Sequence, residues 1–108
     1  MGNHIILEVY DVKFKLLNEL EPLLEVMTSG INRANMTILN IFTHKFTPQG
    51  LTILFALAES HVSLHSFPEE GCLTFDAYTC GVANPKIIVI ELLKYLNSEN
   101  YKLRQLYR

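Results

Sequence analysis

A polar segment, residues 59–65, follows directly on an apolar one, and this junction most constrains what the chain can fold into. Residues 51–58 are apolar apart from one threonine, a composition that is typical of a buried strand. The next seven positions hold one carboxylate, two hydroxyls and two imidazoles. Buried strands seldom carry so many polar groups unless they build a site, because each unpaired polar group costs free energy. We therefore expect the polar segment to form part of a functional site.

Alternation of side chains divides the polar segment between two faces if it is extended. One face of residues 61–67 then carries the polar and aromatic side chains His61, Ser63, His65 and Phe67. The opposite face carries Val62 and Leu64, which we expect to pack in the core.

The composition of the 108-residue chain is that of a single globular domain. Hydrophobic residues make up 49% and charged residues 19%, which suffices to fill a core. The mean hydropathy is high for a small soluble monomer, which indicates that a partner chain covers some apolar surface. The net charge is -2 and the nine basic residues form no run, so we expect no nucleic-acid partner.

The two cysteines, Cys72 and Cys80, are eight residues apart in a segment with strand alternation. A strand rises about 3.3 Å per residue, so about 26 Å would separate them, too far for a disulfide. We find neither a secretory signal nor a stretch of about 18 apolar residues that could span a bilayer. We therefore expect a cytoplasmic protein with reduced cysteines and no membrane contact.

The hydrophobic pattern predicts five strands and two helices in the order β-α-β-β-β-β-α. The expected strands are residues 4–10, 36–46, 51–58, 61–67 and 72–80. The first helix opens at Glu21-Pro22, although Gly30 weakens the pattern of its last turns; the second runs from Asn84-Pro85 to about Asn97. Residues 11–18 are either a connector or a first helical turn, and residues 98–108 either an edge strand or a frayed tail. This order predicts an α+β two-layer α/β sandwich with a mainly antiparallel sheet.

Two of the expected strands make further predictions about faces. Alternation within residues 36–46 places Ile38 on the same face as Asn40, Phe42, His44 and Phe46. The strand at residues 51–58 is apolar on both faces, as expected of a central strand that is covered on two sides.

Several polar side chains fall at intervals that could bring them together: Glu8, His44, Thr52, Ser60, His65 and Cys80. Judged by residue types alone, the best enzyme arrangement is a nucleophile pair of Cys80 and His65. A zinc site from His61, His65 and Cys80 lacks any supporting C-x-x-C or H-E-x-x-H motif, so we expect no metal. Each of these residues, taken singly, is also typical of a structural role.

Four motifs stand in an order and spacing that one known family shares. They are residues 59–69 (ESHxxLHSFPE), Gly2-x-His4 with Glu8, His44-x-Phe46-x-Pro48-x-Gly50, and Asp76-x-x-Thr79-Cys80-Gly81. Together they resemble the signature of the prokaryotic S-adenosylmethionine decarboxylase proenzymes, which are pyruvoyl enzymes of polyamine and spermidine biosynthesis. The resemblance covers about residues 2–96.

The resemblance implies a proenzyme that cuts itself between Glu59 and Ser60. Ser60 Oγ attacks the Glu59 carbonyl, a step that needs a strained peptide and donors for the developing oxyanion. Thr52 stands where the family has a serine hydroxyl for that purpose, and His65 matches the histidine that removes the Ser60 α-proton. The products would be a β chain, residues 1–59, and an α chain, residues 60–108, that begins with a pyruvoyl group made from Ser60.

The resemblance also implies the roles of the remaining site residues. The pyruvoyl carbonyl would form a Schiff base with the substrate amine and accept electrons as CO₂ leaves. Cys80 matches the family's proton donor, and Phe46, Phe67 and Glu69 match residues that hold adenine and ribose. Glu8 and Glu70 complete the expected substrate-binding set.

The implied assembly is a homodimer in which two protomers pack sheet to sheet in an αββα arrangement. The chain departs from the common pattern with Thr52 for Ser, Phe67 for Trp and Glu70 where Tyr is frequent. S-adenosylmethionine is the expected small-molecule substrate. Two alternatives stay open: the same machinery acting on arginine or ornithine, and a non-processing homologue that only partners an active subunit.

Overall fold

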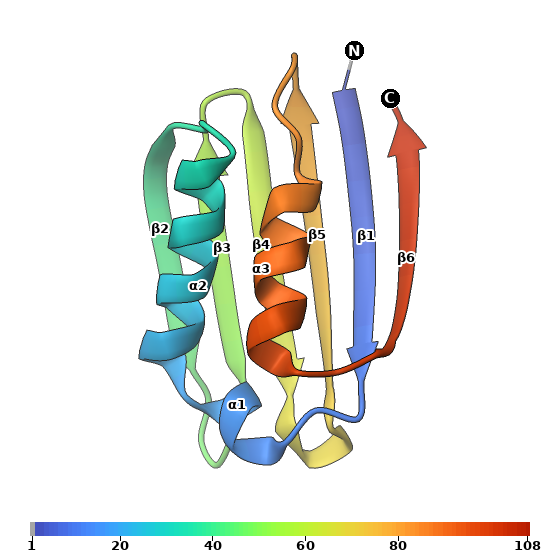
Figure 1. The fold of residues 1–108 in the computed structure, drawn as a ribbon. Helices are drawn as coiled ribbons and strands as arrows, with labels where there is room; N and C mark the ends of the chain where they lie inside the picture. Colours follow the sequence, from blue (N-terminus) through green and yellow to red (C-terminus); the bar gives the residue numbers. More distant parts are fainter. Residues whose placement is uncertain (1) are drawn as a thin grey trace.

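The protein is a single six-stranded sheet with helices on one face (Figure 1). The computed structural model describes residues 2–108. The strands are β1 (Gly2–Tyr10), β2 (Ile38–Lys45), β3 (Leu51–Leu57), β4 (Ser60–Phe67), β5 (Cys72–Cys80) and β6 (Asn100–Tyr107). Their order in the sheet is β2-β3-β4-β5-β1-β6, and each neighbouring pair is antiparallel. The predicted α+β two-layer fold is confirmed.

Two helices cover the sheet, α2 (Leu20–Arg33) over β2 and β3 and α3 (Lys86–Leu96) over β4 and β5 (Figure 1). The short helix α1 (Phe14–Asn18) and the 3₁₀ turn η1 (Pro68–Glu70) lie at one end of the sheet. Alternate residues of the inner strands point toward the helices and are fully buried, for example Ile5, Leu7, Ile53, Leu64 and Leu73. Burying each such side chain contributes about 1.5–3 kcal/mol, so this one-sided core stabilises the fold.

Helix α2 continues through Gly30, where the sequence pattern was weak. A Cβ atom at Gly30 would lie 3.1 Å from the Cα of Ile88 in α3. Few real Cβ atoms make so close a contact, so the glycine lets the two helices approach each other. The weak pattern therefore reflects close helix packing rather than the end of the helix.

The structure decides between the alternatives that the sequence left open for residues 98–108 and for residues 11–18. Residues 100–107 form the edge strand β6, which pairs with β1 from Asn3–Tyr107 to Tyr10–Asn100. The segment after β1 contains one helical turn, α1. Both features depend on long-range pairing with β1 or on packing against η1, which the local pattern does not reveal.

Strand β2 corrects one predicted face. Ile38 pairs with Leu57, whereas Asn40 pairs with Ala56, so a β-bulge shifts the alternation by one residue. Ile38 therefore lies on the helix-covered face and packs against the core. Asn40, Phe42 and His44 remain on the other face, as predicted. The prediction for Ile38 was wrong because a bulge leaves no mark on the hydrophobic pattern.

The sheet face opposite the helices is uncovered in the single chain, and we call it the open face. The predicted division of residues 61–67 is confirmed, because Val62 and Leu64 are buried whereas His61 and His65 are exposed. Strand β3, expected to be covered on two sides, is buried on the helix side only, and Leu54 remains 38% exposed. No helix within residues 2–108 is long and apolar enough to cross a membrane.

We predict that Leu92→Ala lowers the free energy of unfolding by about 2–5 kcal/mol, because it opens a cavity between α3 and the sheet. Leu92 is 0% exposed, whereas Ile90 in the same helix is 57% exposed. The matched variant Ile90→Ala should change the stability by less than about 0.5 kcal/mol. Urea denaturation of both variants measures the difference, and equal losses would contradict the one-sided core.

Candidate active site

The predicted site residues form two groups, one at each end of β4. We call Glu59, Ser60 and Cys80 the cleavage cluster. We call the hollow near the other end, where β4 runs into η1, the pocket. The sheet register fixes both, because Leu57 pairs with Ser60 at the first end and Leu51 pairs with Ser66 near the second.

The cleavage cluster is built on a tight turn. Because Leu57 pairs with Ser60, only Ala58 and Glu59 connect β3 to β4. Glu59 has φ +60°, in the left-handed region that two-residue hairpin turns usually fill with glycine or asparagine. An ordinary L-residue there costs roughly 1–2 kcal/mol. The peptide bond between Glu59 and Ser60 is therefore flanked by a strained residue.

Cys80 makes hydrogen bonds to both residues that flank this peptide bond, Glu59 and Ser60. Its backbone N–H donates to Ser60 Oγ at 3.2 Å, and its thiol donates to the Glu59 carbonyl oxygen at 3.0 Å. A donor on that carbonyl oxygen stabilises the oxyanion that forms when a nucleophile attacks the carbonyl carbon. The cluster thus brings together a hydroxyl, the carbonyl of a strained residue and a thiol that donates to that carbonyl.

Tyr78 is a neighbour of this cluster that the sequence analysis missed. It precedes Cys80 by two residues on β5, so both side chains lie on the open face. The pKa of the Tyr78 phenol is raised, mainly by a hydrogen bond with Cys80 and to a smaller extent by burial. The Arg108 guanidinium lies 5.0 Å from the centre of the Tyr78 ring and opposes this rise. Only the period-two spacing from Cys80 could have pointed to Tyr78.

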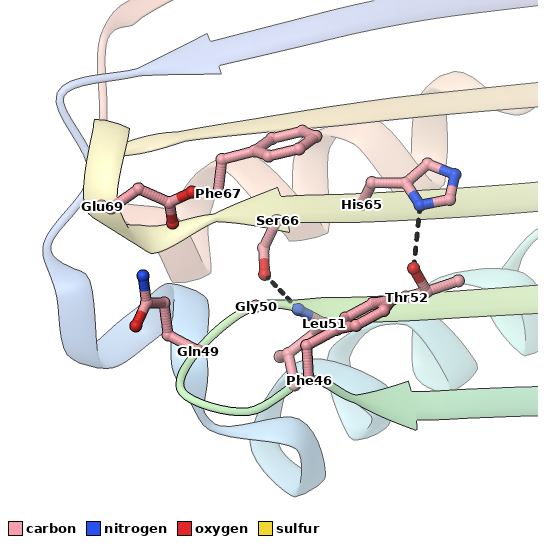
Figure 2. Close-up of a pocket in the computed structure, with 9 residues that line it drawn as sticks. All are labelled: Phe46, Gln49, Gly50, Leu51, Thr52, His65, Ser66, Phe67 and Glu69. Carbon is pink, nitrogen blue, oxygen red and sulfur yellow. Dashed lines mark hydrogen bonds between the residues drawn. The ribbon is translucent and has the colours of Figure 1, made fainter.

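Figure 2 shows the pocket, a cavity of about 330 Å³. Its walls come from the β2–β3 connection and the start of β3 on one side, and from the end of β4 and η1 on the other. The lining residues are Phe46, Gln49, Gly50, Leu51, Thr52, His65, Ser66, Phe67 and Glu69. The predicted adenine and ribose residues therefore share one cavity with the two predicted processing residues.

Within the pocket, Thr52 Oγ1 lies 3.0 Å from His65 Nδ1, a hydrogen-bond distance (Figure 2). This contact fixes the imidazole orientation from the Nδ1 side and leaves Nε2 free to exchange a proton. Gln49 also lines the pocket, and no sequence signal pointed to it because it lies in a turn without a chemical motif.

Glu8 and Glu70, which we expected to bind substrate, lie outside the pocket. Glu8 accepts a hydrogen bond from Tyr10 Oη at 2.7 Å, which raises the pKa of that phenol. It lines a separate recess with Lys102 and Arg104 of β6. Glu70 ends η1 and is exposed. Burial of Cys72 raises the pKa of its thiol, and the negative charge of Glu70 raises that pKa further.

The two ends of the open face do not meet within one chain. His65 follows Ser60 by five residues on the same strand, so about 17 Å separates their Cα atoms. The six polar residues expected to converge therefore divide into groups: His44 pairs with Thr52, which contacts His65, whereas Ser60 contacts Cys80 and Glu8 lies apart from both groups. Neither the Cys80–His65 pair nor the zinc set of His61, His65 and Cys80 assembles in a single chain. Both cysteines are free, as predicted.

Comparison with known proteins gives the family. The sequence profile described as S-adenosylmethionine decarboxylase matches residues 3–108. The chain belongs to the S-adenosylmethionine decarboxylase family. This confirms the resemblance that the four motifs indicated.

Two bacterial relatives and one solved structure show how far the family likeness extends. The S-adenosylmethionine decarboxylase proenzymes of Prochlorococcus marinus and Brevibacillus brevis are 41% and 36% identical to this chain. These alignments cover 100% and 99% of this chain, and 87% and 81% of those proteins. The crystal structure of the adenosylmethionine decarboxylase from Aquifex aeolicus matches with a TM-score of 0.92 at 28% identity, covering 100% of this chain and 90% of that one.

We predict that Glu59→Gly, made in a Ser60→Ala chain, raises the free energy of unfolding by up to about 1 kcal/mol. Glycine removes the cost of the left-handed conformation, and the added freedom of the unfolded chain offsets part of this gain. Ala58→Gly is the matched control, since Ala58 does not have a positive φ and should only lose stability. Equal destabilisation by both changes would show that Glu59 is not strained.

Proposed function

We propose that the protein is a self-processing, pyruvoyl-dependent decarboxylase that acts on S-adenosylmethionine and thereby supplies spermidine biosynthesis. Family membership supports this proposal, and the relatives from Prochlorococcus marinus and Brevibacillus brevis are named as proenzymes. The observation that carries it is the cleavage cluster. Its strained Glu59 carbonyl and the Ser60 hydroxyl are both hydrogen-bonded to Cys80.

The cluster favours chain cleavage by an acyl shift. Ser60 Oγ attacks the Glu59 carbonyl carbon, the peptide C–N bond breaks, and the hydroxyl proton ends on the released Ser60 amine. Cys80 Sγ–H stabilises the oxyanion during this step, because it already donates to the carbonyl oxygen. Release of residues 1–59 as a carboxylate then requires a base that removes the Ser60 α-proton, and His65 is the histidine proposed for that role. The dehydroalanine left at position 60 takes up water and loses ammonia, which leaves the pyruvoyl group.

In a dimer, His65 of one chain could lie close to Ser60 of the other chain. A half-turn about an axis in the open face, perpendicular to the strands, keeps the strand order but reverses the strand direction. It would stack β4 on β4 and set the cleavage cluster of one chain against the pocket of the other. Exposed apolar residues of the open face, Phe42 at 56% and Leu54 at 38%, would be covered. We therefore propose a homodimer whose two sites each use both chains.

The pocket residues suit a nucleoside. Phe46 and Phe67 present aromatic faces on which a base can stack, and the Glu69 carboxylate can accept hydrogen bonds from ribose hydroxyls. The pyruvoyl group supplies the carbonyl that binds the substrate amine and draws off electrons as CO₂ departs. In this proposal the Cys80 thiol, which donates to the Glu59 carbonyl oxygen next to Ser60, has the role of returning a proton to the substrate α-carbon.

The alternative substrates receive less support. The departures from the family pattern at Glu70 and Phe67 suggested arginine or ornithine, but Glu70 does not line the pocket, and Phe67 presents an aromatic ring there together with Phe46. Thr52 motivated a non-processing partner, but its hydroxyl keeps a hydrogen bond with His65. S-adenosylmethionine remains the substrate that the pocket favours.

We predict that the intact mass under denaturing conditions shows two fragments, residues 1–59 and an α chain whose N-terminus is blocked by a pyruvoyl group. Ser60→Ala should leave one uncut chain without activity, because the nucleophile is lost. The control Ser63→Ala removes another β4 hydroxyl outside the cleavage cluster and should still be cut. Processed protein should release CO₂ from carboxyl-labelled S-adenosylmethionine and not from arginine or ornithine. An uncut wild-type chain, or a cut chain that is inactive on S-adenosylmethionine, would contradict the proposal.

A further inference from the structure

A third group of side chains lies on the open face, across the adjacent strands β4, β5 and β1. It consists of His4 on β1, His61 on β4 and Asp76 on β5, and we call it the His–Asp cluster. His4 Nε2 lies 2.7 Å and His61 Nε2 3.1 Å from the same carboxylate oxygen, Asp76 Oδ2. All three atoms lie within 4.8 Å of one another.

The sheet register explains this convergence. Tyr78 on β5 pairs with His4 on one side and with His61 on the other, so the two histidines flank β5. Asp76 precedes Tyr78 by two residues and therefore points to the same face, between the two rings. The imidazole centres are 6.0 Å apart with the rings nearly perpendicular. Three adjacent strands of a sheet hold the group, so its geometry is set before any ligand arrives.

The carboxylate is oriented and charged for a cation. The Ser63 hydroxyl donates to Asp76 Oδ1, which leaves Oδ2 for the two imidazoles. Hydrogen bonds from Ser63, His4 and His61 converge on the Asp76 carboxylate, which is only partly exposed. In metal sites, a ligand carboxylate typically accepts a hydrogen bond from a second residue, which fixes the orientation of the carboxylate.

We propose that the His–Asp cluster binds one divalent cation of the zinc type through His4 Nε2, His61 Nε2 and Asp76 Oδ2. Two imidazoles and a carboxylate form a ligand set that zinc and its neighbours in the transition series prefer. The cation replaces the protons that now lie between the rings and the carboxylate, and a fourth position stays open for water. The zinc set considered from the sequence was His61, His65 and Cys80; His4 and Asp76 come from distant segments and form no motif with His61.

Two other groups face the cluster. Arg108 Nη1 lies 3.5 Å from His4 Nδ1, and the guanidinium extends over the Tyr78 ring. A metal on Nε2 of His4 requires the proton on Nδ1, so Arg108 must turn away from that atom. Arg108 is exposed, which leaves it free to turn toward solvent. Its positive charge opposes a cation, so removing it should tighten binding.

The cation would also connect the two products of cleavage. His4 lies before the Glu59–Ser60 bond, whereas His61 and Asp76 lie after it. A metal shared by all three would join the β chain to the α chain. This consequence, unlike the site itself, rests on the proposed self-processing.

The test uses an untagged, chelator-treated Ser60→Ala chain, which cannot be processed by the proposed route, so that metal binding is judged separately from that function. Titration with Co²⁺, followed by its visible absorption, and competition with Zn²⁺ should show a single saturable site per chain. His61→Gln and Asp76→Asn should each weaken binding at least about tenfold. Arg108→Ala should bind more tightly, and His44→Gln, a histidine of the open face outside the cluster, should bind as the parent does.

Binding should also weaken as the solution is acidified, because protons compete with the metal for its ligand atoms. Thermal unfolding confirms that each variant is folded, and Zn²⁺ should raise the unfolding temperature of the parent but not of His61→Gln. Absence of saturable binding in the parent chain would overturn the proposal. Binding that His61→Gln and Asp76→Asn leave unchanged would overturn it as well.

Discussion

The antiparallel pairing of β3, β4 and β5 is the constraint on which the fold and the site both depend. The two-residue turn at Ala58-Glu59 sets it, because Leu57 must then pair with Ser60. A slip of one residue would turn His61 and His65 into the helix layer and expose the apolar residues between them. Burying the His61 and His65 side chains would cost free energy, which disfavours such a slip. The observed register places the Ser60 hydroxyl within hydrogen-bond distance of the Cys80 backbone N–H.

One-sided burial then determines where chemistry can occur. Helices α2 and α3 cover one face of the sheet, so the polar half of each strand gathers on the open face (Figure 1). Along β4 the strained Glu59 carbonyl and the Ser60 hydroxyl lie at one end, and a histidine in an aromatic pocket lies at the other. Because a strand is stiff and extended, these ends cannot meet in one chain, and a second copy in reversed orientation is the simplest way to join them.

Much of the fold could be predicted because alternation reports burial directly. The faces of β1, β4 and β5 and the start of helix α3 near Asn84 follow from local patterns. The bulge in β2 and the pairing of β6 could not be predicted, since both depend on contacts between distant strands. The left-handed conformation of Glu59 was hidden as well, because glutamate rarely adopts it and only the two-residue turn imposes it. The family motifs pointed to the expected site residues, but their spacing in the sequence did not show that these residues form two separate groups in the fold.

The most direct test of a site shared between two chains is a mixed dimer. One chain carries Ser60→Ala, the other His65→Ala, and different affinity tags allow each chain to be followed by intact mass. We predict that neither chain is cut alone, and that the His65→Ala chain is cut when the Ser60→Ala chain accompanies it and supplies the histidine. Cleavage of the His65→Ala chain by itself, or an uncut mixture of folded dimers, would contradict the shared site.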